Sequence, residues 1–192
     1  MIELEKRVII VSLEGMGTMN NYFSVSHKRR IISNMRRQKV YLETTLFNYY
    51  IDKDRDAHAD TVKLFKEIAD GKYEAFTLTY TTDELENAPE DKREKMLGLI
   101  AEYDIAVLAP NDEAVRIADI YIAEEVIPKK YRTDGLHIAI ATVNELDMII
   151  SMNFRHIVKR KTILATGKIN NLNGYRAIEI YSPMEVIEDE ND

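Results

Sequence analysis

The chain has 192 residues, of which 45% are hydrophobic and 31% are charged, with seven glycines and four prolines. This composition excludes collagen-like, low-complexity and wholly disordered chains, and it predicts a soluble globular protein with its own core. The absence of cysteine excludes disulfides, cysteine-ligated zinc, iron–sulfur clusters and a thiol nucleophile. No apolar run approaches the roughly 18 residues needed to span a bilayer, so we expect a cytoplasmic protein without a membrane anchor.

The two ends of the chain carry opposite charge. Residues 1–39 hold eight Lys and Arg against three Glu, which leaves 18 basic against 30 acidic residues for the rest. The basic N-terminal residues indicate either a phosphate contact surface or a solvated arm. Residues 185–192 hold five acids and no base, which predicts a frayed acidic tail.

A domain that starts with a strand needs nothing upstream of residue 39. We therefore interpret residues 1–38 as a dispensable or flexible N-terminal extension, and we expect the folded domain over residues 39–184. One hypothesis for the extension is an upstream start codon, since Met35 stands just before the first expected strand. N-terminal sequencing of the native protein tests this hypothesis, and a mature Met1 counts against it.

From residue 39 onward, short apolar runs alternate with segments of helical spacing. The expected strands are 39–43, 75–80, 104–110, 147–151 and 176–183. The expected helices are 44–50, 57–69, 81–88, 89–103, 112–125 and 133–143. Pro89 stands at the first turn of one helix and Asn111 or Asp112 caps another. Strands that alternate with helices predict an α/β fold with a parallel sheet covered on both faces.

Ligands of such sheets bind beyond the carboxyl ends of the strands. The polar residues that follow the apolar runs are Glu43, Thr44, Glu84, Asp134, Ser151 and Asn153. Three carboxylates at one edge repel one another unless a cation neutralises them. Oxygen ligands without clustered His or Cys favour Mg²⁺ or Mn²⁺ over zinc. Such an ion lowers the pKa of a bound water and stabilises charge on a phosphodiester.

Three of these residues also have a purely structural interpretation. Residues 81–84 match the S/T-x-x-E capping box, so Glu84 would satisfy backbone N–H groups. Asp134 lies at an expected helix start, where its charge complements the helix dipole. Asn153 would cap a helix over residues 154–160. Glu43 has no such explanation, because it simply ends an apolar strand.

Four segments carry a family resemblance: VYLETTLFNYY, DELENAP, TDGLHIAIATVNELDMIIS and SMNFRHI. Together they resemble the PIN-domain nucleases, particularly the small solitary proteins related to VapC toxins. The resemblance covers residues 39–183 and implies a three-layer α/β/α fold with a central parallel sheet. It also implies an Mg²⁺- or Mn²⁺-dependent endoribonuclease that hydrolyses RNA, with oligomerisation, such as a homodimer, and a protein antitoxin as further expectations.

The resemblance assigns a role to each site residue. Glu43, Glu84 and Asp134 are similar to the metal-binding acids of the family, and Asn153 takes the fourth catalytic position, where it orients water or phosphate. Thr45 supports the first carboxylate, and we expect Ser151 to support the site as well. The chain departs from the family by having Glu at 43, where Asp is commoner. It also has a neutral Asn at 153, where many relatives have Asp, so the site carries one negative charge fewer.

A run of basic residues follows Asn153 without an intervening acid. It consists of Arg155, His156, Lys159, Arg160 and Lys161. The run predicts either an RNA-binding phosphate track or an ordinary solvated helix face.

A non-enzymatic alternative uses the same fold. In it, the chain is a catalytically impaired PIN-fold scaffold that acts through protein or RNA binding, and the neutral Asn153 is the feature that favours it. The apolar segments with Tyr49, Tyr50 and Phe65 offer an interface for oligomerisation or an antitoxin, but burial in the core is the favoured explanation for them.

Overall fold

A computed structural model describes residues 36–188. The interpretation of residues 1–35 as an extension, and that of residues 189–192 as the end of an acidic tail, therefore fall outside the described residues. Within residues 36–188, no helix is both long and apolar enough to cross a membrane.

Five parallel strands form one sheet in the order β3-β2-β1-β4-β5. Their bounds are β1 Gln38–Leu42, β2 Tyr73–Leu78, β3 Ala106–Leu108, β4 Met148–Ile150 and β5 Glu179–Tyr181. All five expected strands are present, and those at the sheet edges are shorter than the sequence suggests. In the central strand β1, Val40–Leu42 are buried, and its neighbour β4 is buried over its whole length. This burial explains the continuous apolar character of both strands.

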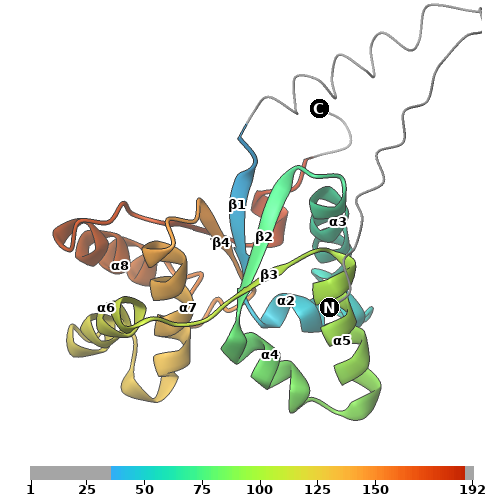
Figure 1. Ribbon diagram of the computed structural model, residues 1–192, viewed down its shortest axis with the longest axis horizontal. Coiled ribbons are helices and arrows are strands. Elements are labelled where there is room, and N and C mark those ends of the chain that lie inside the picture. Colours follow the sequence, from blue (N-terminus) through green and yellow to red (C-terminus); the bar gives the residue numbers. More distant parts are fainter. Residues whose placement is uncertain (1–35, 189–192) are drawn as a thin grey trace, which may run out of the picture. The chain divides into compact units, whose positions relative to one another are not determined.

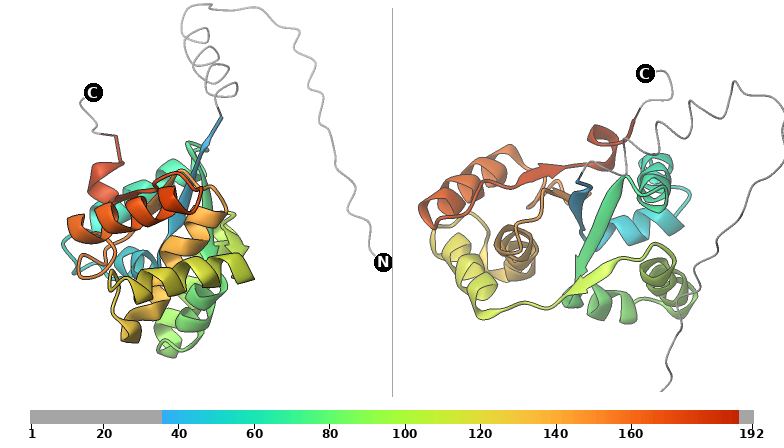
Figure 2. Two further views of the ribbon diagram at one scale, coloured as in Figure 1. Left: turned by 90° about the vertical axis from the view of Figure 1, so that its left-hand side faces the viewer. Right: turned by 45° about the horizontal axis from the view of Figure 1, so that its top comes forward.

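Seven α-helices in the described part of the chain cover the sheet. They are α2 Thr45–Ile51, α3 His58–Ala69, α4 Thr79–Glu86, α5 Glu90–Glu102, α6 Asp112–Ala123, α7 Arg132–Val143 and α8 Arg160–Leu172. Figures 1 and 2 show α6, α7 and α8 on one face of the sheet and α2, α3 and α5 on the other. The predicted three-layer α/β/α fold class is thereby confirmed.

Each face of the sheet has its own hydrophobic core. One core surrounds α7, in which every residue from Gly135 to Thr142 is buried. This burial explains why α7 is apolar all round instead of amphipathic. The second core packs Leu64 and Phe65 of α3 against β1 and α2. Phe65 is therefore a core residue, with its ring centroid 4.8 Å from that of Tyr50.

The junction between β2 and α4 differs from the sequence prediction. Leu78 is the last extended residue, and α4 begins at Thr79, so the predicted strand end at residue 80 is wrong. Thr81 lies inside the helix, where its hydroxyl accepts a hydrogen bond from Thr44 Oγ1 at 3.2 Å. The capping-box interpretation of Glu84 is therefore wrong as well. Tertiary packing of Thr81 against β1 overrides the local strand propensity of this segment.

The segment after β4 also differs. Residues 154–158 form turns, and α8 begins only at Arg160, after an extended Lys159. The predicted helix over residues 154–160 is therefore wrong. Asn153 caps a turn instead, with Oδ1 accepting from the backbone N–H of His156 at 3.1 Å.

Two predicted helix starts are confirmed. Asn111 caps α6 by accepting a hydrogen bond from Ala114 N at 2.8 Å, and Asp134 lies in the first turn of α7. At the C-terminal end of the described chain, a 3₁₀ turn (η2, Pro183–Glu185) is followed by residues that contact β2 and α3. Tyr73 donates its hydroxyl to Val186 O at 2.9 Å, and Glu188 N donates to Glu67 Oε1 at 2.9 Å.

Candidate functional site

The strand order reverses between β1 and β4. The chain adds β2 and β3 on one side of β1, then crosses over to add β4 and β5 on the other. Such a switch point opens a crevice at the carboxyl ends of the two central strands. Glu43 directly follows β1 and Ser151 directly follows β4. The backbone N–H of Glu43 donates to Ile150 O at 3.2 Å, which fixes the two strand ends side by side.

Glu43 is buried, with only 4% of its surface exposed. Its Oε2 accepts three hydrogen bonds: from Thr45 Oγ1, from Thr45 N at 3.2 Å and from Ser151 Oγ at 2.9 Å. Burial raises the pKa of Glu43, and these hydrogen bonds act in the opposite direction. No donor within residues 36–188 reaches Oε1, so one carboxylate oxygen is held by the protein and the other is free for a ligand.

Asp134 approaches the same place from the start of α7. Asn153 Nδ2 donates to Asp134 Oδ1 at 3.2 Å, and Asn153 N donates to Ser151 Oγ at 2.9 Å. Burial, followed by the negative charges of Glu43 and Glu84, raises the pKa of Asp134 to about 6. We call Glu43, Asp134, Ser151 and Asn153 the carboxylate centre. Hydrogen bonds connect these four residues, and the charge of Glu43 acts on Asp134.

The remaining predicted residues lie at different distances from the carboxylate centre. Thr45 belongs to its edge, since Thr45 Oγ1 also accepts from Met152 N at 3.0 Å. Glu84 is exposed on α4, and it acts on Asp134 through its charge. Within the described chain, no group of three or more His, Asp or Glu side chains lies at metal-ligand spacing. The charges of both Glu43 and Glu84 act on Asp134. Among the described residues, hydrogen bonds through Ser151 and Asn153 link Glu43 to Asp134, and none of them involves Glu84.

The donor set fits a hard divalent cation. Mg²⁺ is commonly held by one or two carboxylates, with waters and substrate phosphates completing its coordination. Glu43 and Asp134 are two such carboxylates: burial raises the pKa of each, and repulsion by the charge of Glu43 raises the pKa of Asp134 further. A cation removes that repulsion. Glu43 and Asp134 are thus the residues that would hold Mg²⁺ or Mn²⁺, with Glu84 adding negative potential.

A buried pair beneath the centre was missed by sequence reasoning. Tyr41 Oη lies 2.5 Å from His137 Nδ1, and both side chains are buried. Burial lowers the pKa of His137 to about 4, which keeps its ring neutral at physiological pH. The available signal was spacing, since His137 lies three residues after Asp134 and therefore on the same side of α7. The pair is a buried, hydrogen-bonded link between β1 and α7, and the charges of Glu43 and Glu84 act on Tyr41.

The predicted RNA-binding residues surround the turn after β4. Arg155 is exposed and His156 is half-buried within this turn, Lys159 is extended, and Arg160 and Lys161 open α8. Phe154, which the sequence reasoning did not single out, is 53% exposed beside Asn153.

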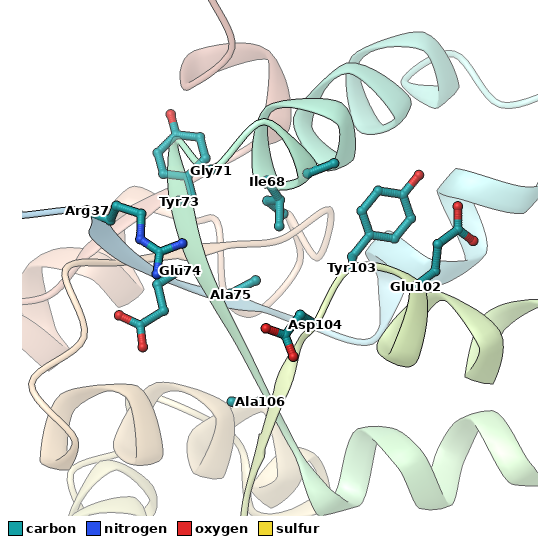
Figure 3. A pocket seen from close by; sticks show the side chains of 11 residues that line it. Arg37, Ile68, Gly71, Tyr73, Glu74, Ala75, Glu102, Tyr103, Asp104 and Ala106 are labelled. Carbon is teal, nitrogen blue, oxygen red and sulfur yellow. The ribbon is translucent and has the colours of Figure 1, made fainter. Parts of the chain in front are cut away.

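A separate cavity of about 420 Å³ lies at the amino end of the sheet (Figure 3). Arg37, Glu74, Tyr103 and Asp104 are among its lining residues, so its charges are mixed. None of the predicted site residues contributes to it. Since parallel sheets bind ligands at the carboxyl ends of their strands, the carboxylate centre is the candidate site.

No protein-family model matches the chain, and no curated protein sequence matches it. Among solved structures, the chain is similar to VapBC2 from Rickettsia felis bound to a DNA fragment from its promoter. The TM-score is 0.48 and the sequence identity is 8%, over 76% of this chain and 98% of that chain. At this identity the likeness says nothing about activity, so a functional proposal has to rest on the geometry of the site.

Proposed function

We propose that the chain is an Mg²⁺- or Mn²⁺-dependent endoribonuclease of the PIN type that hydrolyses RNA phosphodiester bonds in the cytoplasm. One observation carries the proposal. Glu43 and Asp134, which come from distant parts of the chain, lie close together at the switch point of the sheet, where burial and, after it, the negative charge of Glu43 raise the pKa of Asp134 to about 6. An arrangement that costs folding free energy without a cation is expected at a metal site.

Each side chain of the centre has a distinct task in this mechanism. When bound, the metal ion supplies a water of lowered pKa and neutralises negative charge on the phosphate. Thr45 and Ser151 hold Glu43 Oε2, so that Oε1 would be left to bind the cation. Asn153 restrains Asp134 through Oδ1, and with a pKa of about 6 Asp134 is ionised at neutral pH. Glu84 raises the local cation concentration through its charge.

The partners follow from the same proposal. Exposed basic side chains after Asn153 would contact the RNA backbone. A toxin-type role would add a protein antitoxin, and the family resemblance adds a homodimer.

A scaffold function is the second candidate. It is favoured by the neutral Asn153 and by the exposed position of Glu84, since no group of three or more potential metal ligands is found within residues 36–188. On this alternative the fold binds protein or RNA without hydrolysing it, and metal binding is not required.

The deciding experiment measures cleavage of a labelled single-stranded RNA pool by the full chain with Mn²⁺ or Mg²⁺. Asp134→Asn and Glu43→Gln should each lower the rate by at least about 100-fold, the scale typical of removing one group that stabilises charge at the reacting centre. Asp70→Asn is the matched control, because Asp70 is an exposed acid at the end of α3, and it should cleave like the wild type. A chelator should abolish cleavage.

Absence of cleavage in every preparation, together with no heat of Mn²⁺ binding by titration calorimetry, would overturn the nuclease proposal in favour of the scaffold. Cleavage that survives in both variants would point to a contaminating nuclease.

A further inference from the structure

A small cavity with basic walls lies beside the carboxylate centre. It has a volume of about 260 Å³, and we call it the basic cavity. Its charged and polar lining residues are Glu125, Arg155, His156, Lys159, Lys161 and Thr162. Three cations therefore face one acid, so the cavity has a positive balance before any charge on His156 is counted.

The histidine ring in this wall is held in place. The ring centroids of His156 and Tyr131 lie 3.8 Å apart with the planes 31° from parallel. The backbone N–H of His156 donates to Asn153 Oδ1 at 3.1 Å. Stacking and this hydrogen bond together fix the side chain against the cavity wall.

His156 Nε2 is the one buried side-chain nitrogen or oxygen within the described chain that has no hydrogen-bond partner. Buried polar atoms in native structures are nearly always satisfied, so such an atom calls for an explanation. Burial lowers the pKa of His156, and the positive charges of Arg155, Lys159 and Lys130 lower it further. An anion in the cavity would explain both the unpaired Nε2 and the excess of positive charge. Its oxygens accept hydrogen bonds, and its charge offsets the surrounding cations.

The backbone at this place is also suited to an anion. Lys159 is the N-cap of α8 and makes no side-chain capping bond, and the first turn of the helix contains no acid. Amide N–H groups of an uncapped first turn are left without intrahelical acceptors and bind phosphate well. The helix start thus adds to the cationic side chains that line the cavity.

Asn153 connects the basic cavity to the carboxylate centre. Its Nδ2 donates to Asp134, and its Oδ1 accepts from His156 N. The two sites therefore share one turn of chain, which is the structural reason to expect that one RNA strand contacts both.

We propose that the basic cavity binds one phosphate group of an RNA strand and so positions the strand across the carboxylate centre. This inference rests on the proposed nuclease function for its purpose, although the binding step does not require hydrolysis. Free phosphate offers the same chemistry as a backbone phosphodiester, so the experiment compares the two.

The first measurement is binding of a short labelled single-stranded RNA to the full chain, by fluorescence anisotropy in chelator over a range of salt concentrations. The test variant is Lys159→Gln with Lys161→Gln, which removes two exposed cavity cations. The matched control is Lys66→Gln with Lys168→Gln, which removes the same charge from exposed positions outside the basic cavity. Both pairs are exposed, so both variants should fold like the wild type.

Loss of one phosphate contact should reduce the slope of log affinity against log salt by about 0.7. We expect this reduction, with affinity about tenfold weaker, in the test variant and not in the control. Equal behaviour of the two variants would overturn the proposal. Because binding is measured without metal, the result remains interpretable if the nuclease proposal fails. Unaltered RNA binding by the test variant would overturn phosphate binding in the basic cavity and would leave the nuclease proposal intact.

The second measurement follows the ring signals of His156 by NMR during titration with the RNA and, separately, with inorganic phosphate. Movement with RNA that the test variant abolishes supports a backbone phosphodiester in the cavity. Movement with inorganic phosphate alone would overturn the role in positioning RNA, and no movement with either would overturn phosphate binding altogether.

Discussion

The carboxylate centre and the basic cavity meet at Asn153, yet they hold their charges in opposite ways. Glu43 is 4% exposed and takes three hydrogen bonds on one oxygen, whereas Arg155 and Lys159 are exposed. Buried charges depend on the atoms around them, while solvated charges keep their hydration and tolerate substitution. The comparison teaches that substitutions in the centre should change both stability and function, and those in the cavity should change binding alone.

The largest effect on stability is expected at Thr45. Thr45→Ala removes the hydroxyl that donates to Glu43 and accepts from Met152 N, and a hydrogen bond to a charged group contributes about 2 kcal/mol. We expect the free energy of unfolding in urea to fall by that amount. Thr45→Ser keeps the hydroxyl and serves as the control, so an equal loss in both variants would mean that the methyl packing matters and the hydrogen bond does not.

A gain of stability is expected for Asp134→Asn in chelator. The pKa of Asp134 is raised to about 6 in the folded state from about 3.9 in an unfolded chain. Its ionised form therefore destabilises the fold, by an amount that grows from about pH 4 to about pH 6 and stays constant above. Two pKa units convert to about 3 kcal/mol, but Asp134 is only partly buried and solvent screens its charge. Urea unfolding at pH 7.5 should therefore show Asp134→Asn about 1–2 kcal/mol more stable than the wild type, and the gain should vanish near pH 4. A gain independent of pH would contradict this explanation.

Asn153→Asp tests the missing charge of the centre. The substitution replaces a donor to Asp134 with a third carboxylate beside it, so we expect about 1 kcal/mol lower stability in chelator. The same charge should strengthen Mn²⁺ binding about tenfold, equivalent to about 1.4 kcal/mol. Titration calorimetry measures the affinity, with Asn171→Asp on the exposed face of α8 as the control. Unchanged Mn²⁺ affinity would mean that the side chain at position 153 does not contribute to metal binding.

The smallest effect is expected for Lys159→Gln with Lys161→Gln. Both side chains are exposed, and surface substitutions away from special features usually change stability by no more than about 0.5 kcal/mol. Thermal unfolding should therefore match that of the wild type. A decrease of about 2 kcal/mol in the free energy of unfolding would show that these lysines stabilise the fold. The basic cavity would then not differ from the carboxylate centre in this respect.

Much of this architecture could be predicted from local patterns. The apolar runs around Val40 and Ile149 predicted buried parallel strands, and both are present. The periodicity before Val143 predicted a helix, and the structure has a buried helix there with Asp134 in its first turn. Glu43 and Asn153 could be placed near each other because the carboxyl ends of parallel strands share one edge. Each of these inferences uses only residues close together in the chain or a general rule of sheet topology.

Other features could not be predicted from the sequence, because they depend on contacts between distant segments. Thr81 belongs to a helix because its hydroxyl contacts Thr44 from another element, and a local capping pattern does not contain that contact. The turn over residues 154–158 replaces a helix because Asn153 bonds both to Asp134 and within its own turn. The spacing of His137 from Asp134 places it on the same side of α7, but its hydrogen bond with Tyr41 joins two distant segments and needs the tertiary structure.

The sequence by itself determined the order of the five strands and of the helices as far as α7, the α/β class and the acids that stand at strand and helix ends, because backbone propensity and hydrophobic periodicity are local properties. It did not predict α8. Only the tertiary structure decided which of those acids meet. The order of the sheet places β4 beside β1, so Ser151 and Asn153 close around Glu43 and Asp134 while Glu84 stays exposed on α4. Proximity, burial and the resulting pKa of Asp134 are properties of packing between distant segments.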